Sequence, residues 1–344
     1  TVTASTTAAD YVIVGGTGAD TFNIGSDVLT AADSFDGATG TDIVNVTGNT
    51  AVGNGVFDTA TFNAVERINF ANTTTNITWT VADANGEIDN AITVDASSLT
   101  SGVLTFDGAL ETTTANVLTV IGGAAGDAIT GGSGADVLLG NAGDDTFTGG
   151  VGADTITTGA GVDTIITTIG AALGTTVDAI TDFTADTGGD LIKLDISDLE
   201  SITAVTDLTS GTNVSAGAGA ITILEAALLA DGTAMGTATT LTNVTMLVLT
   251  GDTLDSGSTT ALTTAVGTGT VVSWGTGTQQ NEDGILVLYS DGTDAFVSIV
   301  EDSDASSNAA WATSDLSETK IIQISGVTTI GAGDFAVGNF ELIA

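Results

Sequence analysis

Large apolar residues recur at every ninth position between Gly122 and Ile166, and this period predicts the architecture of the centre of the chain. These residues are Ile129, Leu138, Phe147, Ile156 and Ile165. Each is the middle residue of a three-residue strand, and in a strand the middle side chain points away from the face that its neighbours share. Because so strict a period is the signature of a repeat architecture, we expect stacked short strands with inward apolar residues.

The other places of each nine-residue frame predict tight turns. Glycine recurs at the first, second and fourth places, where it allows the backbone to take positive φ. A frame therefore supplies one turn and one strand, and two frames supply one rung with a turn at each side. Turns on the same side of the stack then come from alternate frames.

An aspartate stands at the sixth place of every frame in this block. The five are Asp127, Asp136, Asp145, Asp154 and Asp163. The two-frame rung places Asp127, Asp145 and Asp163 on one edge and the other two on the opposite edge. Stacked strands lie about 4.7–4.9 Å apart and calcium binds oxygen at about 2.3–2.6 Å, so one ion fits between two loops, with turn carbonyls completing its shell. Without an ion, each edge would be a ladder of like charges.

The frames resemble the RTX (repeats-in-toxin) nonapeptide G-G-x-G-x-D-x-U-x. The resemblance implies a calcium-binding parallel β-roll, so we expect an all-β fold in which a β-solenoid is followed by a β-rich C-terminal domain. Three residues depart from the motif: Ala125 at a fourth place, Asn141 at a second place and Thr158 at a first place. A flexible Gly- and Asp-rich linker is the alternative, but linkers do not place Ile, Leu or Phe at every ninth residue.

Residues 1–121 are expected to form N-terminal solenoid rungs with one or two RTX-like frames. A well-formed frame carries Asp20 and a looser copy carries Asp42. A calcium ion that bridges these two aspartates and a simple Gly-Asp turn are both compatible with the pattern. Because the interval between the two aspartates is longer than a rung of two frames, we expect an excursion of the chain near residues 26–34.

Rungs without frames are expected between Val65 and Gly122. Their expected inward residues are Val94, Phe106 and Val120, which follow one another at intervals somewhat longer than one frame. The alternation of apolar and polar residues around them is typical of half-buried strands. The segment from Thr73 to Asp89 is a candidate insertion.

A different acidic pattern follows the frames inside the expected roll and capping rung at residues 122–200. It resembles the element I-x-D-F followed by G-D-x-I-x-L, which closes RTX rolls; the matching residues are Ile180, Asp182, Phe183, Asp190, Ile192 and Leu194. A cap is needed because an open strand edge invites aggregation. Asp182 and Asp190 are candidate ligands for a last calcium ion, and a solvated acidic turn is the alternative.

Residues 201–344 contain no frames and are expected to form the β-rich C-terminal domain. Ile223 to Ala230 has the composition of a short helix. Gly284 to Tyr289 and Ala295 to Val300 flank an Asp-Gly turn, which predicts a hairpin. The apolar end of the chain resembles the C-terminal signal that a type I export system reads in RTX proteins, and a final packed strand fits it equally well.

The charge of the chain limits the kinds of partner that it can bind. Lys and Arg number 3 against 43 Asp and Glu, so the formal charge is -40. Nucleic acid and anionic membranes require a basic footprint, so neither is expected as a partner. No run approaches the roughly 18 apolar residues of a membrane span, and we expect no membrane insertion.

Cysteine and histidine are both absent. Disulfides, the usual zinc ligands and histidine-based nucleophile pairs are therefore excluded. Calcium, which takes oxygen ligands, is the expected cofactor. No catalytic constellation accompanies the many acidic residues, so we do not expect an enzyme.

The Thr- and Ala-rich rungs, the frame block and the β-rich tail together resemble bacterial surface-layer proteins of the RTX type. That resemblance implies a secreted structural protein at the cell surface that self-assembles with calcium into a lattice or filament. Two alternatives use the same calcium chemistry: an adhesin that binds a cell-surface glycan, and the secretion and folding module of a larger exported protein. Because the chain begins at Thr1 and not at Met, we expect a fragment or a processed chain.

Overall fold

A computed structural model describes most of the first half of the chain and parts of the second half. The described residues are 1–3, 12–25, 33–47, 62–71, 74–82, 91–168, 176–185, 188–195, 219–220, 223–227, 240–242, 246–250, 271–273, 284–302, 316–330, 334–335 and 339–343. They consist of strands and turns, which confirms the all-β class. Within these ranges, no helix has the length and apolar character needed to cross a membrane. Two compact units are present, Thr1–Ile165 and Ile166–Ala344, and the expected boundaries at residues 121 and 200 stay predictions.

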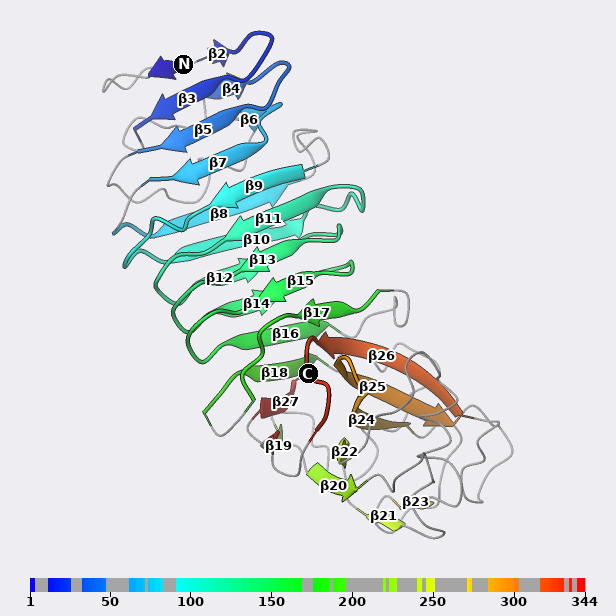
Figure 1. The fold of residues 1–344 in the computed structure, drawn as a ribbon. Helices are drawn as coiled ribbons and strands as arrows, with labels where there is room; N and C mark the ends of the chain where they lie inside the picture. The colour runs from blue at the N-terminus through cyan, green and yellow to red at the C-terminus, as the bar shows by residue number, and fades with distance from the viewer. Residues whose placement is uncertain are drawn as a thin grey trace. The chain divides into compact units, whose positions relative to one another are not determined.

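The first unit is a stack of parallel strands that alternate between facing sheets (Figure 1). One sheet runs in the order β1 (Val2–Thr3), β3 (Thr21–Ile24), β5 (Ile43–Val46), β7 (Arg67–Phe70), β9 (Ala91–Asp95), β11 (Val117–Ile121), β13 (Val137–Leu139) and β15 (Thr155–Thr157). The facing strands are β2 (Val12–Val14), β4 (Ser34–Asp36) and β6 (Phe62–Asn63), then β8 (Ile77–Ala82), β10 (Leu104–Leu110), β12 (Ala128–Thr130) and β14 (Thr146–Thr148). In sequence, β16 (Thr164–Thr168) follows at the boundary between the units.

The pairing register shows where the rungs shorten to the predicted length. Val94 pairs with Val120, an interval of nearly three frame lengths. Val120 then pairs with Leu138, and Leu138 with Ile156, so each of these steps spans two frames. The parallel β-roll is therefore a regular continuation of a solenoid with longer rungs.

The core of the first unit consists of the inward residues expected from the sequence. The five periodic apolar residues of the frames are at most 1% exposed, and so are Val94, Phe106 and Val120. Aromatic rings extend this core toward the N-terminus, with ring centroids 5.6–6.4 Å apart along the series Phe22, Phe35, Phe62, Trp79 and Phe106. Burying these large rings is a major stabilising contribution to the longer rungs.

The candidate insertion at Thr73–Asp89 and the excursion expected near residues 26–34 each contain part of a regular strand. Ile77–Ala82 forms β8 and buries Trp79, so this part of the candidate insertion at Thr73–Asp89 belongs to a normal rung. Residues 83–90 lie outside the described residues. Likewise Ser34 begins β4, while residues 26–32 of the expected excursion also lie outside the described part.

The helix expected at Ile223 to Ala230 is wrong for the residues that the structure describes. Ile223–Ala227 forms strand β20, which pairs in parallel with β22 (Met246–Thr250). A helix of so few residues has little stability of its own, so ladder hydrogen bonds to a neighbouring strand override its local preference. Residues 228–230 lie outside the described ranges.

The second unit contains the predicted hairpin. β24 (Gly284–Ser290) and β25 (Ala295–Asp302) are antiparallel, and β26 (Leu316–Ile324) extends them. β26 also pairs in parallel with β17 (Asp178–Ile180), and β24 pairs with β22. β27 (Phe340–Ile343) pairs in parallel with β18 (Leu191–Asp195) and antiparallel with β19 (Gly219–Ala220). A separate parallel pair joins β21 (Thr240–Thr242) and β23 (Val271–Ser273). The end of the chain is therefore a packed strand, and its role in export stays a prediction.

Candidate metal centre

The frame aspartates form two ladders at the turns of the first unit. The backbone N–H of Asp127 donates to Oδ1 of Asp145 at 2.6 Å, and that of Asp145 donates to Oδ1 of Asp163 at 2.7 Å. On the other edge, the N–H of Asp136 donates to Oδ1 of Asp154 at 2.8 Å. Each carboxylate thus holds the backbone of the preceding rung on its own edge. All five side chains are buried.

Three turns use the second carboxylate oxygen for a hydrogen bond within the same frame. The N–H at the second place of the frame donates to Oδ2 of the aspartate at the sixth place. The pairs are Gly16 with Asp20 at 2.7 Å, Gly123 with Asp127 at 2.6 Å and Gly132 with Asp136 at 2.6 Å. We call these closed turns. Each is the first framed turn in its run along an edge.

The following framed turns are open, because their second residue takes a left-handed conformation. Its φ is 67° at Ala38, 73° at Asn141, 101° at Gly150 and 101° at Gly159. In the turn of Gly150, the next N–H donates to the Gly132 carbonyl one rung earlier at 2.9 Å. Stacking on a preceding framed turn therefore replaces the bond to the turn's own aspartate.

In two of the open turns, a carboxylate oxygen has no protein donor. Oδ2 of Asp145 and Oδ2 of Asp42 are buried and accept no hydrogen bond in the structure. Leaving a buried charged group unsatisfied costs more than the roughly 1–3 kcal/mol of a neutral one. These oxygens are therefore the atoms on which a cation has most effect.

A backbone carbonyl approaches the Asp145 oxygen where Gly140 has no side chain. A Cβ at Gly140 would lie 2.1 Å from Oδ2 of Asp145 and 2.4 Å from the carbonyl oxygen of Thr158. The two oxygens are thus no further apart than two ligands of one calcium ion, each bound at about 2.3–2.6 Å. Thr158, which replaces a motif glycine, contributes through its backbone, so its side chain does not remove this oxygen.

The same approach occurs in closed turns, with one difference. At Gly131, a Cβ would lie 2.6 Å from Oδ2 of Asp136 and 2.2 Å from the Gly149 carbonyl oxygen. There, however, Oδ2 already accepts the N–H of Gly132. A closed turn therefore balances its carboxylate partly by a backbone dipole.

Burial and neighbouring like charges raise the pKa values of aspartates in the ladders. Burial raises the pKa of Asp145 to about 7, and the charges of Asp127, Asp163 and Asp144 add to this effect, while the backbone hydrogen bond with Asp127 opposes it. Burial also raises the pKa values of Asp127 and Asp136, against the backbone hydrogen bonds to their carboxylates. A divalent cation would favour the ionised form of all three carboxylates.

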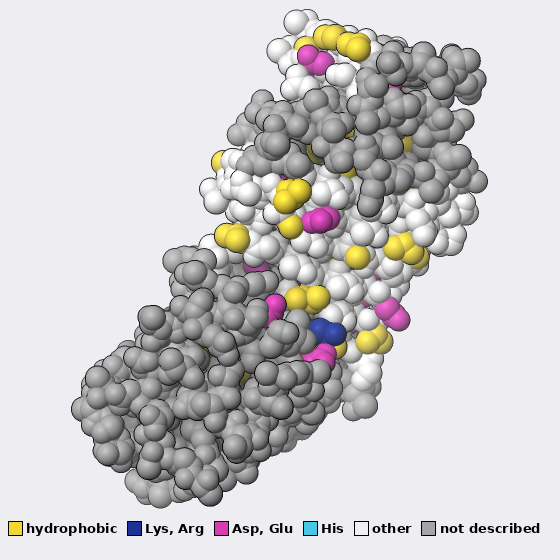
Figure 2. All heavy atoms as spheres, turned by 180° about the vertical axis from the view of Figure 1, so that it is seen from behind, with side chains coloured by type: hydrophobic (Ala, Val, Ile, Leu, Met, Phe, Trp, Pro, Cys, Tyr) yellow, Lys and Arg dark blue, Asp and Glu magenta, His cyan; other side chains and the backbone are white. Residues whose placement is uncertain are grey.

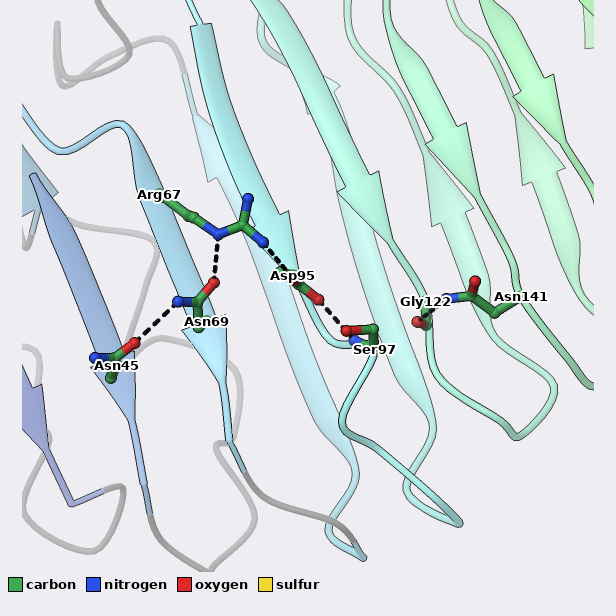
Figure 3. Close-up of polar contacts among 7 residues, drawn as sticks. All are labelled: Asn45, Arg67, Asn69, Asp95, Ser97, Gly122 and Asn141. Carbon is green, nitrogen blue, oxygen red and sulfur yellow. Dashed lines mark hydrogen bonds and ion pairs between the residues drawn. The ribbon is translucent and has the colours of Figure 1, made fainter. Parts of the chain in front are cut away.

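Asn141 links the first two framed turns of one edge. Its side-chain amide donates from Nδ2 to the Gly122 carbonyl oxygen at 2.8 Å (Figure 3). The bond from the Ala142 N–H to the Gly123 carbonyl is 3.3 Å, whereas the equivalent bond of Val151 is 2.9 Å. The backbone hydrogen bond between turns is thus longer where Asn141 replaces glycine at the second place. The Asn141 side-chain amide adds a hydrogen bond that glycine cannot make.

Substitutions at Asn141 should separate these two effects. Asn141→Ala loses the amide bond and places in the left-handed region a residue that tolerates it less well than asparagine, so we expect a loss of about 1–2 kcal/mol in the free energy of unfolding. Asn141→Gly removes both the strain and the bond and should be within about 0.5 kcal/mol of the wild type. Urea unfolding at saturating calcium measures both, and equal losses for the two variants would contradict this view of Asn141.

The two N-terminal aspartates belong to a ladder that includes a glutamate. The Asp20 N–H donates to Oδ1 of Asp42 at 2.7 Å, and the Asp42 N–H donates to Oε2 of Glu66 at 2.6 Å. Because β3, β5 and β7 share a sheet with β13 and β15, this ladder lies on the same edge as Asp136 and Asp154. Glu66 was not predicted from the sequence, because its loop contains no frame. The feature that could have pointed to it is its position directly before strand β7 (Arg67–Phe70).

A further carboxylate, Glu111, was also missed. It is buried in the turn between β10 and β11, on the edge of Asp136, and its charge adds to the raised pKa of Asp136. The side chain lies beside Gly132, where a Cβ would meet the Glu111 Cβ at 3.1 Å. No frame marks this longer rung, so the repeat pattern gave no reason to choose it.

Asp182 and Asp190 lie in the second unit, on the connection between β17 and β18. Asp190 is buried, and its Oδ2 accepts the Thr184 N–H at 2.7 Å, while Asp182 is half-buried. As ligands of a last calcium ion, both stay predictions. Among all described residues, no three acidic side chains gather closely enough to hold a metal by themselves.

On the face in Figure 2, the acidic side chains of the described residues lie apart from one another and form no single patch. The ordered carboxylates are instead the buried ones at the turns. The turns are thus the part of the described structure best suited to a specific cation.

Comparison with known proteins agrees with this site. The family model for the RTX calcium-binding nonapeptide repeat, which spans four copies, matches residues 121–156 and 139–171. These ranges contain the framed turns from Gly122 onward, so this block consists of calcium-binding RTX repeats. A search of curated proteins finds no match to the chain.

Proposed function

We propose that this calcium-binding RTX repeat protein is an extracellular structural protein, whose roll is held together by calcium and which self-assembles into a surface layer or filament. The observation that carries the proposal is the open turn of Asp145, whose buried Oδ2 has no protein donor. Asp145 and the Thr158 carbonyl would hold the ion between consecutive turns of one edge. The ion supplies positive charge to an edge that otherwise stacks like charges.

Calcium should act on folding, because its ligands meet only in the folded roll. The Asp145 carboxylate and the Thr158 carbonyl come from successive turns of one edge and meet only when the rungs are stacked. An ion that binds the native state alone stabilises it by mass action, by about 2.7 kcal/mol at 100 times the dissociation constant. The protein would therefore be only marginally folded where calcium is scarce and fully folded where it is abundant.

The extracellular location rests on the repeat family and on this coupling. RTX repeat proteins are typically secreted, and their repeats are generally structural and not catalytic. Metal-coupled folding also suits a protein that is exported before it folds, because calcium is abundant outside cells. Type I secretion is the export route that we propose.

Self-assembly is proposed from the charge balance. A formal charge of -40 opposes contact between copies. Bound calcium lowers this charge, so neighbouring copies meet more easily when calcium is present. The partner that we propose is therefore a second copy of the same chain.

Electron microscopy of the purified chain tests the assembly. With calcium we expect ordered sheets or filaments, and after chelation we expect dispersed particles. Magnesium is a suitable control, because it demands near-octahedral geometry at about 2.0–2.1 Å and fits flexible carbonyl sites poorly. Single dispersed particles in both conditions would overturn the assembly, and glycan binding without assembly would favour an adhesin instead.

A further inference from the structure

We propose a further cation site outside the matched repeats, between the turn at residues 37–42 and the turn at residues 64–66. Its protein ligands are Oδ2 of Asp42 and the backbone carbonyl of Ala64. The second turn contains no RTX frame and carries Glu66 where a frame would carry aspartate. The second half of the site therefore does not follow from the nine-residue pattern.

The first argument is the state of the Asp42 carboxylate. Its side chain is 0% exposed, and Oδ1 accepts the Asp20 N–H at 2.7 Å. Oδ2 has no hydrogen-bond partner. The N–H of Ala38, which a closed turn would direct to this oxygen, donates instead to Oδ1 of Asp36 at 3.0 Å.

The second argument is the approach of a backbone oxygen to the same place. A Cβ at Gly37 would lie 2.4 Å from Oδ2 of Asp42 and 2.0 Å from the Ala64 carbonyl oxygen. Ala38 and Ala64 both have left-handed φ, 67° and 49°, which is unfavourable for alanine. The two strained alanines belong to the two turns that bring these oxygens together.

The third argument is the lack of a countercharge from the protein. Arg67 is the only Lys or Arg before Lys193 in the sequence. Its guanidinium pairs with Asp95 and donates from Nε to Asn69 at 2.6 Å (Figure 3). Asn69 in turn donates to Asn45 at 2.9 Å, so Arg67 is part of the polar ladder on the outer face of the sheet.

These contacts leave the turn ladder of Asp20, Asp42 and Glu66 without a neighbouring basic side chain, because Arg67 is engaged elsewhere. The available ligands are carboxylate and carbonyl oxygens, which suit a hard divalent cation of the size of calcium. The site lies one rung beyond the bridge between Asp20 and Asp42 that the sequence suggested. Asp20 is not its ligand, because Oδ2 of Asp20 accepts the Gly16 N–H.

Counting bound calcium ions tests the site. Native mass spectrometry of the full chain in calcium should show one ion fewer for Asp42→Asn than for the wild type. Asp20→Asn is the matched control, since it removes an equal charge one rung earlier, and it should keep the full number. An unchanged count for Asp42→Asn, or an equal loss for Asp20→Asn, would overturn the proposal.

A second variant tests the site even if Asp42→Asn does not fold. Glu66→Gln leaves Asp42 in place but removes the neighbouring charge, so at limiting calcium it should reduce the occupancy of one ion. Unchanged occupancy in Glu66→Gln would then contradict the site. Calcium binding at the matched repeats is tested separately through Asp145, so the outcome at one site does not decide the other.

Discussion

Replacing Asp145 by asparagine should raise the calcium concentration at half-maximal folding by at least about tenfold. Even an indirect partner of a bound metal, when lost, costs roughly 10–100-fold in affinity. Asparagine keeps the oxygen that accepts the Asp127 N–H but removes the charge of the buried Oδ2. Far-UV circular dichroism against free calcium concentration measures the midpoint.

Asp127→Asn is the matched control for this substitution. Asp127 lies one rung earlier on the same edge, but its two oxygens accept the N–H groups of Leu104 and Gly123. Because backbone N–H donors already balance this carboxylate, the calcium midpoint of Asp127→Asn should shift less than that of Asp145→Asn. Equal shifts for the two variants would show that open and closed turns do not differ in calcium binding.

The calcium-free protein should be more stable at pH 5 than at pH 8. The pKa of Asp145 rises from 3.8 to about 7 on folding, so the folded state binds a proton that the unfolded state has already lost between these values. The resulting stability is fully present below pH 3.8 and is lost as the pH rises through about 7. Asp127 and Asp136, whose pKa values are also raised, act in the same direction.

Thermal melting in calcium-depleted buffer at pH 5 and pH 8 measures this effect. Asp95, whose pKa is lowered, acts in the opposite direction but only near and below 3.8, outside this range. Asp145→Asn should show a weaker dependence on pH than the wild type. A melting temperature that is constant or rises from pH 5 to pH 8 would contradict the raised pKa of Asp145. With calcium bound, stability should not fall in this way, because the ion requires the ionised carboxylate.

Much of the roll could be predicted from the sequence, because one residue in nine determines each strand's inward side. The spacing from Leu138 to Ile156 translated directly into the observed register. The division of the aspartates between two edges followed from the same period. The rungs between Val65 and Gly122 were recognised from alternation, and their inward residues Val94, Phe106 and Val120 were predicted correctly.

The difference between open and closed turns could not be predicted. Gly123 and Gly150 occupy the same place in their frames, yet only Gly150 has positive φ. The difference depends on whether a framed turn precedes on the same edge, which is a property of the neighbouring rung. Glu66 and strand Ile223–Ala227 were missed for a related reason, since their roles come from pairing partners that are distant in the sequence.

The bond from Asn339 to the Asp190 carbonyl has a consequence for the order of folding. It joins residues 149 positions apart, whereas the ladder bonds of the roll join residues 18 apart. Local contacts close faster than distant ones, so the roll can form while β18 still lacks β27. The final strand, Phe340–Ile343, then completes the sheet of β18 only when the end of the chain is present. A chain interrupted before this point would carry a finished roll and a β18 that lacks its partner β27.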